Sequence, residues 1–488
     1  MSGMTWHPWR QALLTAGAAV VGFDPSTRTW VTDGAQSQGM VDLPPLKGRV
    51  VTDPASRGRA ADDFGHLVHR TPGAVLEPGA VSDILLMMKY CRTHNLQVAA
   101  RGQGHATFGQ GQVAGGLIID MTPLNAVEVR EDTAVVEAGA LWSSLAQATL
   151  AHGLTPPVFT DYLELSVGGT LSVGGVGGQT HHHGAQVDGV VELEVVTGEA
   201  SLRRCSAESR PELFRAALAG RGQCGIITKA TVRLLPAPAT VRHYLLSYPS
   251  VAALTADQRC VVNDGRFAYV EGELGLPTGS TGWSYQLEAV AFFNGTTPPD
   301  DARLLDGLSD QPGDRQIQDM SYFDFLNRLA AGVAYLKSTG EWYRPHPWWN
   351  MFLPASRTDA FVEAAIKDLT ETEVGASGVV LLYPFPRARL HLPLLRMPDE
   401  ETVFLFTLLR TASHGAENPQ DMVEANRSLY LRAQAVGGYQ YPVGSIPTTH
   451  EEWRTHYGPA WAAFQTARER YDPDGILTPG QGVFPPRP

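Results

Sequence analysis

A histidine set among glycines is the first pattern that suggests chemistry. The stretch RGQGHATFGQGQ, residues 101–112, places His105 directly after Gly104 and follows it with further glycines. Glycine has no side chain, so its backbone can approach a ligand closely. An imidazole in such a loop is either a reactive group held against a ligand or a polar side chain in a flexible loop. The stretch alone leaves both interpretations open.

Two acids stand in apolar surroundings that suit proton transfer. Asp161 lies in VFTDYLELS and Glu271 lies in AYVEGEL. Partial burial can tune the pKa of a carboxylate so that it accepts a proton or a hydrogen bond. From local sequence alone, Asp161 is more often a turn-forming or helix-capping residue, and Glu271 is more often an exposed residue on a strand.

The histidines and cysteines do not predict a metal site. Three consecutive residues, His181 to His183, cannot all face one ion on a regular element, so we expect a solvated loop or a polar contact to a cofactor. The cysteines are too sparse and too widely spaced for a metal knuckle or a disulfide framework, so buried free thiols are expected. They are Cys91, Cys205, Cys224 and Cys260.

A second glycine-rich stretch indicates a large phosphate-containing cofactor. SVGGTLSVGGVGGQ, residues 166–179, has six glycines in fourteen residues, which lets several backbone N–H groups point at one ligand. The first glycine loop is not an ordinary dinucleotide fingerprint, because Thr107 stands where the third glycine is needed. GRGQCG, residues 220–225, has the right spacing but lies between a helix pattern and a strand pattern, which is the reverse of the nucleotide-binding order.

Composition excludes some classes of partner. The chain has 488 residues, with 50 acidic against 38 basic side chains and a net charge of -12, which disfavours nucleic acid and anionic membrane surfaces. No apolar run approaches the ~20 residues of a membrane span. A short apolar segment after Arg10 resembles the middle of an export signal, but only one arginine precedes it. We therefore expect a cytoplasmic protein, with export as the alternative.

The elements that must position these residues follow an α+β pattern. From about residue 62 to 236, short apolar runs alternate with glycine clusters. Residues 75–102 predict a turn, an amphipathic helix capped by Ser82 or Asp83, and a strand. Further strands are expected within residues 115–124, 127–139 and 189–206, and residues 212–238 predict a helix, a glycine loop and a closing strand.

A proline-rich stretch marks a domain boundary. LLPAPAT, residues 234–240, interrupts both helix and strand patterns. Beyond it, residues 266–276 and 378–386 predict strands and residues 357–371 predict a helix. Near the end, Trp453, Tyr457, Trp461 and Phe464 have helical spacing before a glycine-rich turn.

Taken in order, these stretches resemble the cytokinin dehydrogenases, which belong to the vanillyl-alcohol oxidase type of flavin-linked oxidoreductases. The resemblance implies a two-domain α+β fold with an FAD-binding domain at residues 1–237 (core about 62–237), a substrate or cap domain at 238–440, and a C-terminal segment, 441–488, that returns to the FAD domain. The matching stretches are AARGQGHATFGQGQ, FTDYLELSVGGTLSVGGVGGQ, VVELEVVTGEASLRRCS, ELFRAALAGRGQCGIITKATVRLLPAP, YVEG, SYFDFLNRL, RPHPWWNMFLP and YDPDGILTPGQGVF.

The resemblance implies that His105 attaches FAD covalently through an imidazole nitrogen. Ala106 stands where the family usually has a serine, which removes one hydroxyl contact and leaves the linkage chemistry intact. Gly102 and Gly104 would cradle the pyrophosphate, with Gln110 close by. No cysteine lies beside ELSVGG, so a second covalent link is not expected. The other implied flavin contacts are Arg101, Gln103, Ala106, Asp161, Ser166, Ser172, Val176, Ile227, Tyr441, Thr478 and Gln481.

The resemblance also implies the reaction. Asp161 occupies the position of the catalytic aspartate and Glu271 a position near the substrate entrance, while Trp348 and Asn350 resemble an aromatic wall and a polar anchor of the substrate pocket. The activity implied is oxidation of the secondary amine of N6-isoprenoid cytokinins to an imine, which hydrolyses to adenine and an aldehyde. A quinone or oxygen would then accept the electrons.

One departure from the family keeps other functions open. Plant members commonly carry an acid that faces the purine ring in the helix before HPWLN, where this chain has Gly332 and Val333. The alternatives are therefore a related covalent-flavin oxidase of another small amine or alcohol, or a flavin- or ligand-binding protein without turnover.

Overall fold

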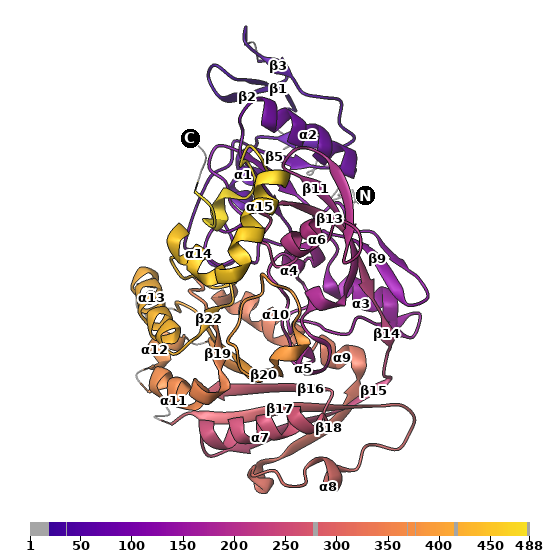
Figure 1. Cartoon of the computed structure of the whole chain (residues 1–488), viewed down its shortest axis with the longest axis vertical. Helices are drawn as coiled ribbons and strands as arrows, with labels where there is room; N and C mark the ends of the chain where they lie inside the picture. Colours follow the sequence, from indigo (N-terminus) through magenta and orange to yellow (C-terminus); the bar gives the residue numbers. More distant parts are fainter. Residues whose placement is uncertain are drawn as a thin grey trace, which may run out of the picture.

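The computed structural model describes residues 19–35, 37–276, 282–367, 369–375, 377–413 and 418–485. Figure 1 shows the strands of the first half of the chain at one end of an elongated molecule and a large sheet at the other. The C-terminal helices lie beside the first half. Most of the apolar segment after Arg10 falls outside the described residues, so the export alternative stays untested.

A parallel arrangement positions the first glycine loop. In the sheet β4-β5-β7-β6, the strands β5 (Ala74–Glu77) and β6 (Val98–Arg101) both pair in parallel with β7 (Leu117–Asp120), while β4 (Arg49–Val51) is antiparallel to β5. The predicted helix, α2 (Val81–Thr93), connects β5 to β6. The loop with His105 therefore leaves β6 at the carboxyl edge of the parallel strands.

The predicted cap of α2 is wrong. The residue before the helix is Ala80, and both Ser82 and Asp83 lie inside its first turn. Asp83 instead accepts backbone hydrogen bonds from Lys47 at 3.0 Å, and from Gly48 and Gly79 at 2.8 Å. Tertiary contacts thus place the Asp83 carboxylate against backbone N–H groups of the loop at Lys47 and Gly48.

A five-stranded antiparallel sheet, in the order β12-β11-β13-β9-β8, holds the second glycine stretch. The strands are β8 (Val127–Val129), β9 (Thr133–Glu137), β11 (Val190–Thr197), β12 (Leu202–Ser206) and β13 (Gly225–Arg233). They confirm the expected strands in this part of the chain. The helix α6 (Pro211–Ala217) precedes β13 as predicted, and α4 (Val167–Leu171), inside the glycine stretch, contacts β9 and β13.

The third sheet has eight antiparallel strands, in the order β18-β15-β17-β16-β20-β21-β19-β22. They are β15 (Thr240–Tyr248), β16 (Tyr269–Gly275), β17 (Ser284–Phe293), β18 (Gln316–Ser321), β19 (Trp349–Pro354), β20 (Val379–Pro386), β21 (Thr402–Leu409) and β22 (Tyr439–Gln440). The boundary stretch, residues 234–240, contains β14 (Leu235–Pro236), which pairs with β10 (Leu154–Thr155), and ends at the first residue of β15.

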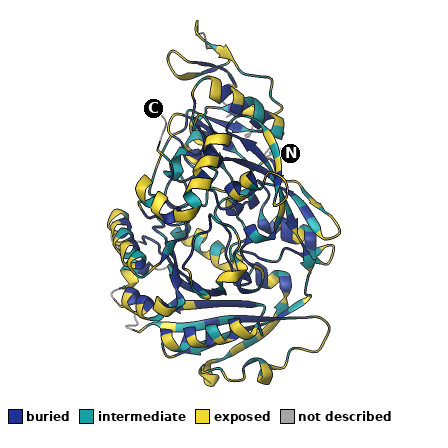
Figure 2. Cartoon of the chain, viewed as in Figure 1, coloured by how far each residue is buried: buried dark blue, intermediate teal, exposed yellow. Residues whose placement is uncertain are grey.

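The two faces of this large sheet differ because side chains alternate along each strand. Trp349, Met351 and Leu353 pack in a core with α7 (Val251–Asp264) and α11 (Ala355–Ile366), whereas Phe352 belongs to the core of the first half of the chain. Figure 2 shows the sheet buried between exposed helices and the rest of the molecule. The inner face is therefore the one that meets the glycine loops.

The C-terminal segment returns to the first sheet. The expected helical spacing is realised in two helices, α14 (His450–Tyr457) and α15 (Trp461–Tyr471), because Pro459 lies in a short 3-10 turn between them. Leu477 then pairs with Val98, and the N–H of Thr478 donates to the carbonyl of Val98 at 2.8 Å.

The remaining elements complete the fold. Among the described residues, no helix is both long enough and apolar enough to cross a membrane. The other elements are β1 (Val20–Asp24), β2 (Thr29–Thr32), β3 (Val41–Asp42), α1 (Pro54–Ala60), α3 (Trp142–Leu150), α5 (Thr180–His183), α8 (Asp301–Leu304), α9 (Tyr322–Leu326), α10 (Ala330–Thr339), α12 (Glu371–Val374) and α13 (Pro419–Ala435).

The cysteine prediction is confirmed for three of the four residues. All four are free thiols, and Cys91, Cys205 and Cys224 are buried. Cys260 is exposed, because it lies on the outer side of α7, away from the residues that this helix buries.

Candidate active site

His105 lies in an aromatic enclosure. Its ring stacks on Phe64, with centroids 4.0 Å apart, and meets the edge of Trp348 at 5.6 Å; Tyr162 and Trp342 lie at 5.2 and 5.9 Å. Burial lowers the pKa of His105 to about 3, so the imidazole is neutral at physiological pH. Among the described residues, no hydrogen bond reaches its ring nitrogens, which leaves their lone pair available for bonding.

A second histidine completes this enclosure. His346 stacks on the other face of Phe64, with centroids 4.0 Å apart and planes 12° apart. Its backbone N–H donates to the carbonyl of Gly65 at 3.0 Å, and burial lowers its pKa to about 4. The sequence prediction did not include Phe64, Trp342 or His346, although the last two flank or belong to the aromatic stretch that carries Trp348.

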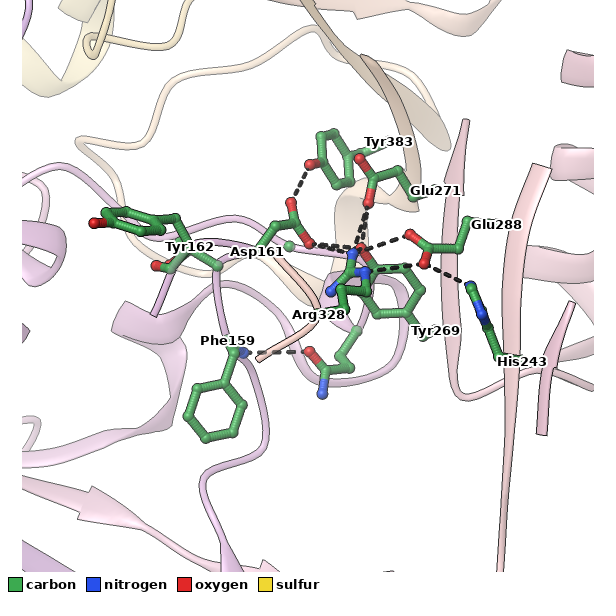
Figure 3. Close-up of polar contacts among 12 residues, drawn as sticks. Phe159, Asp161, Tyr162, His243, Tyr269, Glu271, Glu288, Arg328 and Tyr383 are labelled. Carbon is green, nitrogen blue, oxygen red and sulfur yellow. Dashed lines mark hydrogen bonds and ion pairs between the residues drawn. The ribbon is translucent and has the colours of Figure 1, made fainter. Parts of the chain in front are cut away.

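Asp161 lies in a different environment, a network of hydrogen bonds drawn from three parts of the chain (Figure 3). The hydroxyl of Tyr269 donates to Asp161 Oδ1 at 2.5 Å, and that of Tyr383 donates to Oδ2. The guanidinium of Arg328 lies 3.0 Å from Oδ1. The carboxylate is thus held by three donors without being sealed from the rest of the site.

Glu271 joins the same network through Tyr269. The two residues are two positions apart on β16 and point to the same face, and the Tyr269 hydroxyl also contacts Glu271 Oε2. Glu271 is 4 % exposed, and burial, followed by the charges of Asp161 and Glu288, raises its pKa well above the usual range. The raised pKa favours the neutral, protonated form of Glu271.

Proton counting gives the direction of these bonds. The Tyr269 oxygen carries one proton, yet it contacts oxygens of both Asp161 and Glu271 and also receives an N–H of Arg328 at 2.6 Å. A protonated Glu271 satisfies all three contacts, because it donates to Tyr269, which then donates to Asp161. Tyr269 thus connects the carboxyl groups of Asp161 and Glu271.

Arg328 balances the charge of the network from the loop after α9. It contacts Glu288 at 2.9 Å and lies 3.4 Å from Glu271, with its guanidinium 4.6 Å from the ring centroid of Phe325. The ring of His243 lies 2.7 Å from Glu288 Oε1. Burial raises the pKa of Glu288, but Arg328 and His243 outweigh it and lower the pKa on balance.

The structure brings Asp161 and Glu271 together, but through Tyr269 rather than directly. Of the predicted substrate residues, Trp348 lies against His105, whereas Asn350 is 1 % exposed and its side-chain nitrogen has no partner among the described residues. Trp349, between them, turns to the opposite core. Tyr269, Glu288, Arg328 and Tyr383 were not predicted as site residues, although Tyr269 and Arg328 stand inside quoted motifs.

The other predicted cofactor residues connect the two glycine loops with the C-terminal return. The close packing of Gly102 on Ser166 is an example, since a Cβ at Gly102 would lie 2.0 Å from Ser166 Oγ. Further links are Tyr441 Oη accepting from Gly175 N–H at 3.0 Å, Gln110 Nε2 donating to Gly444 O at 3.1 Å, Thr478 Oγ1 donating to Gly222 O at 2.9 Å, and Gln481 Oε1 accepting from Arg221 Nε at 2.6 Å.

The remaining members of the predicted set differ in burial. Val176 and Ile227 are buried, Ser172, Arg101 and Ala106 are half-buried, and Gln103 is exposed. Arg101 donates to the backbone carbonyl of Asp62. Their contacts with a cofactor stay a prediction.

An orphaned amide beside the second glycine stretch fits a polar cofactor. Gln186 is 3 % exposed, and neither its side-chain oxygen nor its nitrogen has a partner among the described residues. A Cβ at Gly175, whose φ is +75°, would lie 2.1 Å from Gln186 Oε1. Buried polar groups normally have partners, so this amide is suited to a ligand that brings donors and acceptors, as FAD does. Nothing in the local sequence singled out Gln186.

Of the two alternatives for the histidine stretch, the solvated loop is wrong for His181, although His183 is exposed, and the polar contact to a cofactor stays a prediction. His181 is buried in the short helix α5, and its ring nitrogens lie 2.8 and 3.0 Å from the carbonyls of Gly178 and Phe267. His182 also contacts the carbonyl of Phe267, at 2.8 Å. No group of three metal-ligating side chains occurs among the described residues.

Two family models match the chain. One, described as FAD binding domain, matches residues 72–206, and the other, described as Cytokinin dehydrogenase 1, FAD and cytokinin binding, matches residues 276–484. The chain is 40 % identical to an uncharacterised oxidoreductase of the fasciation locus of Rhodococcoides fascians, covering 88 % of this chain and 97 % of that protein. It is 35 % identical to cytokinin dehydrogenase 4 of Arabidopsis thaliana, covering 89 % of this chain and 92 % of that protein.

Solved structures show the fold. 6-Hydroxy-D-nicotine oxidase of Arthrobacter nicotinovorans matches with a TM-score of 0.70 at 20 % identity, covering 89 % of this chain and 98 % of that one. A VAO-type flavoprotein of Myceliophthora thermophila matches with a TM-score of 0.66 at 17 % identity, covering 86 % and 81 %. The α+β fold of this type is the one expected from the sequence.

Proposed function

The chain belongs to the cytokinin dehydrogenase family of FAD-dependent oxidoreductases, and on that premise we propose that it oxidises the secondary amine of N6-isoprenoid cytokinins to an imine. The imine hydrolyses to adenine and an aldehyde. The observation that carries this proposal is the carboxylate of Asp161, held by Tyr269, Tyr383 and Arg328 beside the aromatic enclosure of His105.

In the proposed mechanism, FAD and Asp161 have separate roles. When bound, FAD would supply the acceptor for the hydride that leaves the carbon next to the amine nitrogen. Asp161 accepts the proton or hydrogen bond of the amine N–H, so that the nitrogen becomes electron-rich as the hydride leaves. Glu271 stays neutral and donates through Tyr269, which keeps a second negative charge out of the network. Arg328 holds the Asp161 carboxylate in one orientation.

We propose that His105 attaches FAD covalently. Its low pKa keeps the imidazole neutral, and its ring nitrogens lack hydrogen-bond partners among the described residues, so a lone pair is free to form the bond. The backbone of residues 101–112 and 166–179, with the C-terminal return, would hold the rest of the cofactor. The division into an FAD-binding domain at 1–237, a substrate domain at 238–440 and a returning segment at 441–488 stays a prediction.

Trp348 and Asn350 would form the substrate pocket. The unpartnered side-chain nitrogen of Asn350 offers a donor, and Trp348 offers an aromatic wall beside His105. Gly332 and Val333 lie on α10, which buries none of its residues. Ring recognition in this protein would therefore rest on Trp348 and Asn350 rather than on an acid of that helix.

Anaerobic reduction of the flavin tests the proposed function. Isopentenyladenine added without oxygen is expected to bleach the visible flavin absorbance of the purified protein. Bleaching by another small amine or alcohol, but not by isopentenyladenine, would favour the related oxidase. Tight binding without bleaching by any compound of the panel would favour a non-catalytic binding protein. Reoxidation of the bleached protein by oxygen or by a quinone then identifies the electron acceptor.

A further inference from the structure

The loop of residues 219–223, between α6 and β13, buries a cation that has no acidic partner among the described residues. Arg221 is 3 % exposed. Its guanidinium contacts neutral groups: Nε donates to Gln481 Oε1 at 2.6 Å, and the group lies 4.0 Å from the ring centroid of Trp453. Its Nη1 has no hydrogen-bond partner among the described residues. An arginine keeps its charge even when buried, so this arrangement is unfavourable unless an anion joins it.

The backbone of this loop is strained in a way that the local sequence does not require. Ala219 and Arg221 adopt positive φ angles of 55° and 57°, and Thr478, which contacts the loop, has a φ of 46°. Residues other than glycine rarely adopt this conformation, and such strain concentrates in ligand sites. Gln223 donates to the carbonyl of Thr478 at 3.2 Å, so the two strained segments hold each other.

The neighbours of Arg221 are residues that the sequence assigned to the cofactor. The N–H of Arg221 donates to the carbonyl of Ser172 at 2.8 Å, which ties the loop to the second glycine stretch. Gln481 and Thr478 link it to the C-terminal return. All three were expected to line the flavin, and Arg221 was not. Arg221 is therefore at the junction of the segments that would enclose FAD.

A second arginine adds to the positive charge of this region. Arg396 has a buried Nε without a partner among the described residues. It follows Leu395, which would lie 3.0 Å from a Cβ at Gly174 in the second glycine stretch. Burial first, and then the charges of Arg221 and Arg396, lower the pKa of His456 to about 3, so both cations lie near one imidazole. No carboxylate of the described residues lies close enough to affect the pKa of His456 or of Arg221.

We propose that Arg221 binds a negatively charged group of FAD, a role that deepens the proposed function because it assumes that FAD fills the region between these segments. FAD has two such groups: the diphosphate, and the ring when it is reduced. The stretch GRGQCG is no dinucleotide fingerprint, since a helix precedes it and a strand follows it. It contributes one buried guanidinium instead, oriented by Trp453 and Gln481.

Binding of flavins to the apoprotein tests this role. The background is His105→Ala, which makes FAD exchangeable, and the dissociation constants of FAD, FMN and riboflavin are measured by fluorescence quenching. Arg221→Leu is expected to weaken FAD at least tenfold if the arginine takes the diphosphate, with little change for riboflavin. If it takes the reduced ring, oxidised FAD binds normally and the midpoint potential falls by about 30 mV for each tenfold loss of preference for the reduced form.

Two variants separate charge from folding. Arg215→Leu, at an exposed position of α6, is the control and is expected to bind all three flavins like the background protein. Arg221→Gln keeps a polar side chain beside Gln481 and replaces Arg221→Leu if the latter does not fold by circular dichroism. If the folded Arg221 variant keeps both the control's flavin affinities and its midpoint potential, the proposal is wrong. The readout is flavin binding, so a failure to oxidise cytokinins would leave this test unaffected.

Discussion

Two neighbouring regions of the site bury ionisable groups in opposite ways. His105 is enclosed by the rings of Phe64, Tyr162, Trp342 and Trp348, and burial is the largest cause of the lowered pKa that keeps it neutral. Asp161 is enclosed by hydroxyl groups and a guanidinium, which satisfy a charge rather than remove it. An apolar enclosure thus suits a group that must offer a lone pair, and a polar network suits a group that must receive a proton.

The two regions also depend differently on pH. The lowered pKa of His105 contributes stability that is present above its unfolded value of about 6.5 and is lost as the pH falls towards 3. The raised pKa of Glu271 contributes stability that is present below its unfolded value of about 4.5 and is lost as the pH rises towards its folded value. Each of the following variants changes one group, either in the aromatic enclosure of His105 or in the polar network of Asp161.

Removing the imidazole should have the largest effect. His105→Ala is expected to abolish covalent flavin completely, because the other histidine described in this enclosure, His346, has partners at both ring nitrogens, the Trp342 carbonyl and the Thr411 hydroxyl. The measurement is the yellow colour of protein precipitated with acid. His152→Ala, at an exposed position, is the control and should stay yellow. Colour that persists in the precipitated His105→Ala protein would contradict the covalent link.

Removing the charge of Asp161 should slow flavin reduction by about 10²- to 10⁴-fold, the usual contribution of a general base. Asp161→Asn keeps the shape of the side chain, and its remaining oxygen can still accept from Tyr269 and Arg328. The measurement is the rate of anaerobic bleaching by isopentenyladenine in a stopped-flow instrument. Glu164→Gln, three residues away and outside the network, should change the rate little. An unchanged rate in Asp161→Asn would show that the amine needs no carboxylate here.

Removing the cation of the network should destabilise the protein. Arg328→Met removes the guanidinium that pairs with the half-buried carboxylates of Asp161 and Glu288, which costs about 3–5 kcal/mol of unfolding free energy. Urea unfolding measures this loss. Arg357→Met, at an exposed position of α11, should lose less than ~1 kcal/mol. If both variants unfold at the same urea concentration, Arg328 does not hold the network together.

Neutralising Glu271 should have the smallest effect, with a sign that depends on pH. Glu271→Gln replaces an acid whose raised pKa favours the neutral form in the folded protein, whereas it ionises at lower pH when unfolded. The variant should therefore gain stability relative to the wild type by up to about 1.4 kcal/mol for each pH unit above 4.5, up to the folded pKa. Unfolding at pH 5, 6 and 7 measures this slope. A difference that is independent of pH would mean that Glu271 is ionised in the folded protein.

The sequence by itself determined the local parts of this protein. The strands around the glycine loops, the helices α2, α6 and α11 and the positions of His105, Asp161 and Glu271 follow from periodicity, from glycine spacing and from motif resemblance. These signals lie within short windows, and the forces behind them are local as well. The α+β fold and the FAD-binding family could be predicted from the sequence for the same reason.

Only the tertiary structure decided which groups meet. Tyr383 is 222 positions from Asp161, yet its hydroxyl donates to that carboxylate. Arg328 is 167 positions from Asp161 and reaches it from a loop whose motif does not reveal its role. The same holds for Asp83, which also binds the backbone of a distant loop at Lys47 and Gly48, and for Arg221, whose lack of an acidic partner among the described residues is visible only after folding. Strand register and the return of the C-terminal segment set these contacts, and both depend on packing across the whole chain.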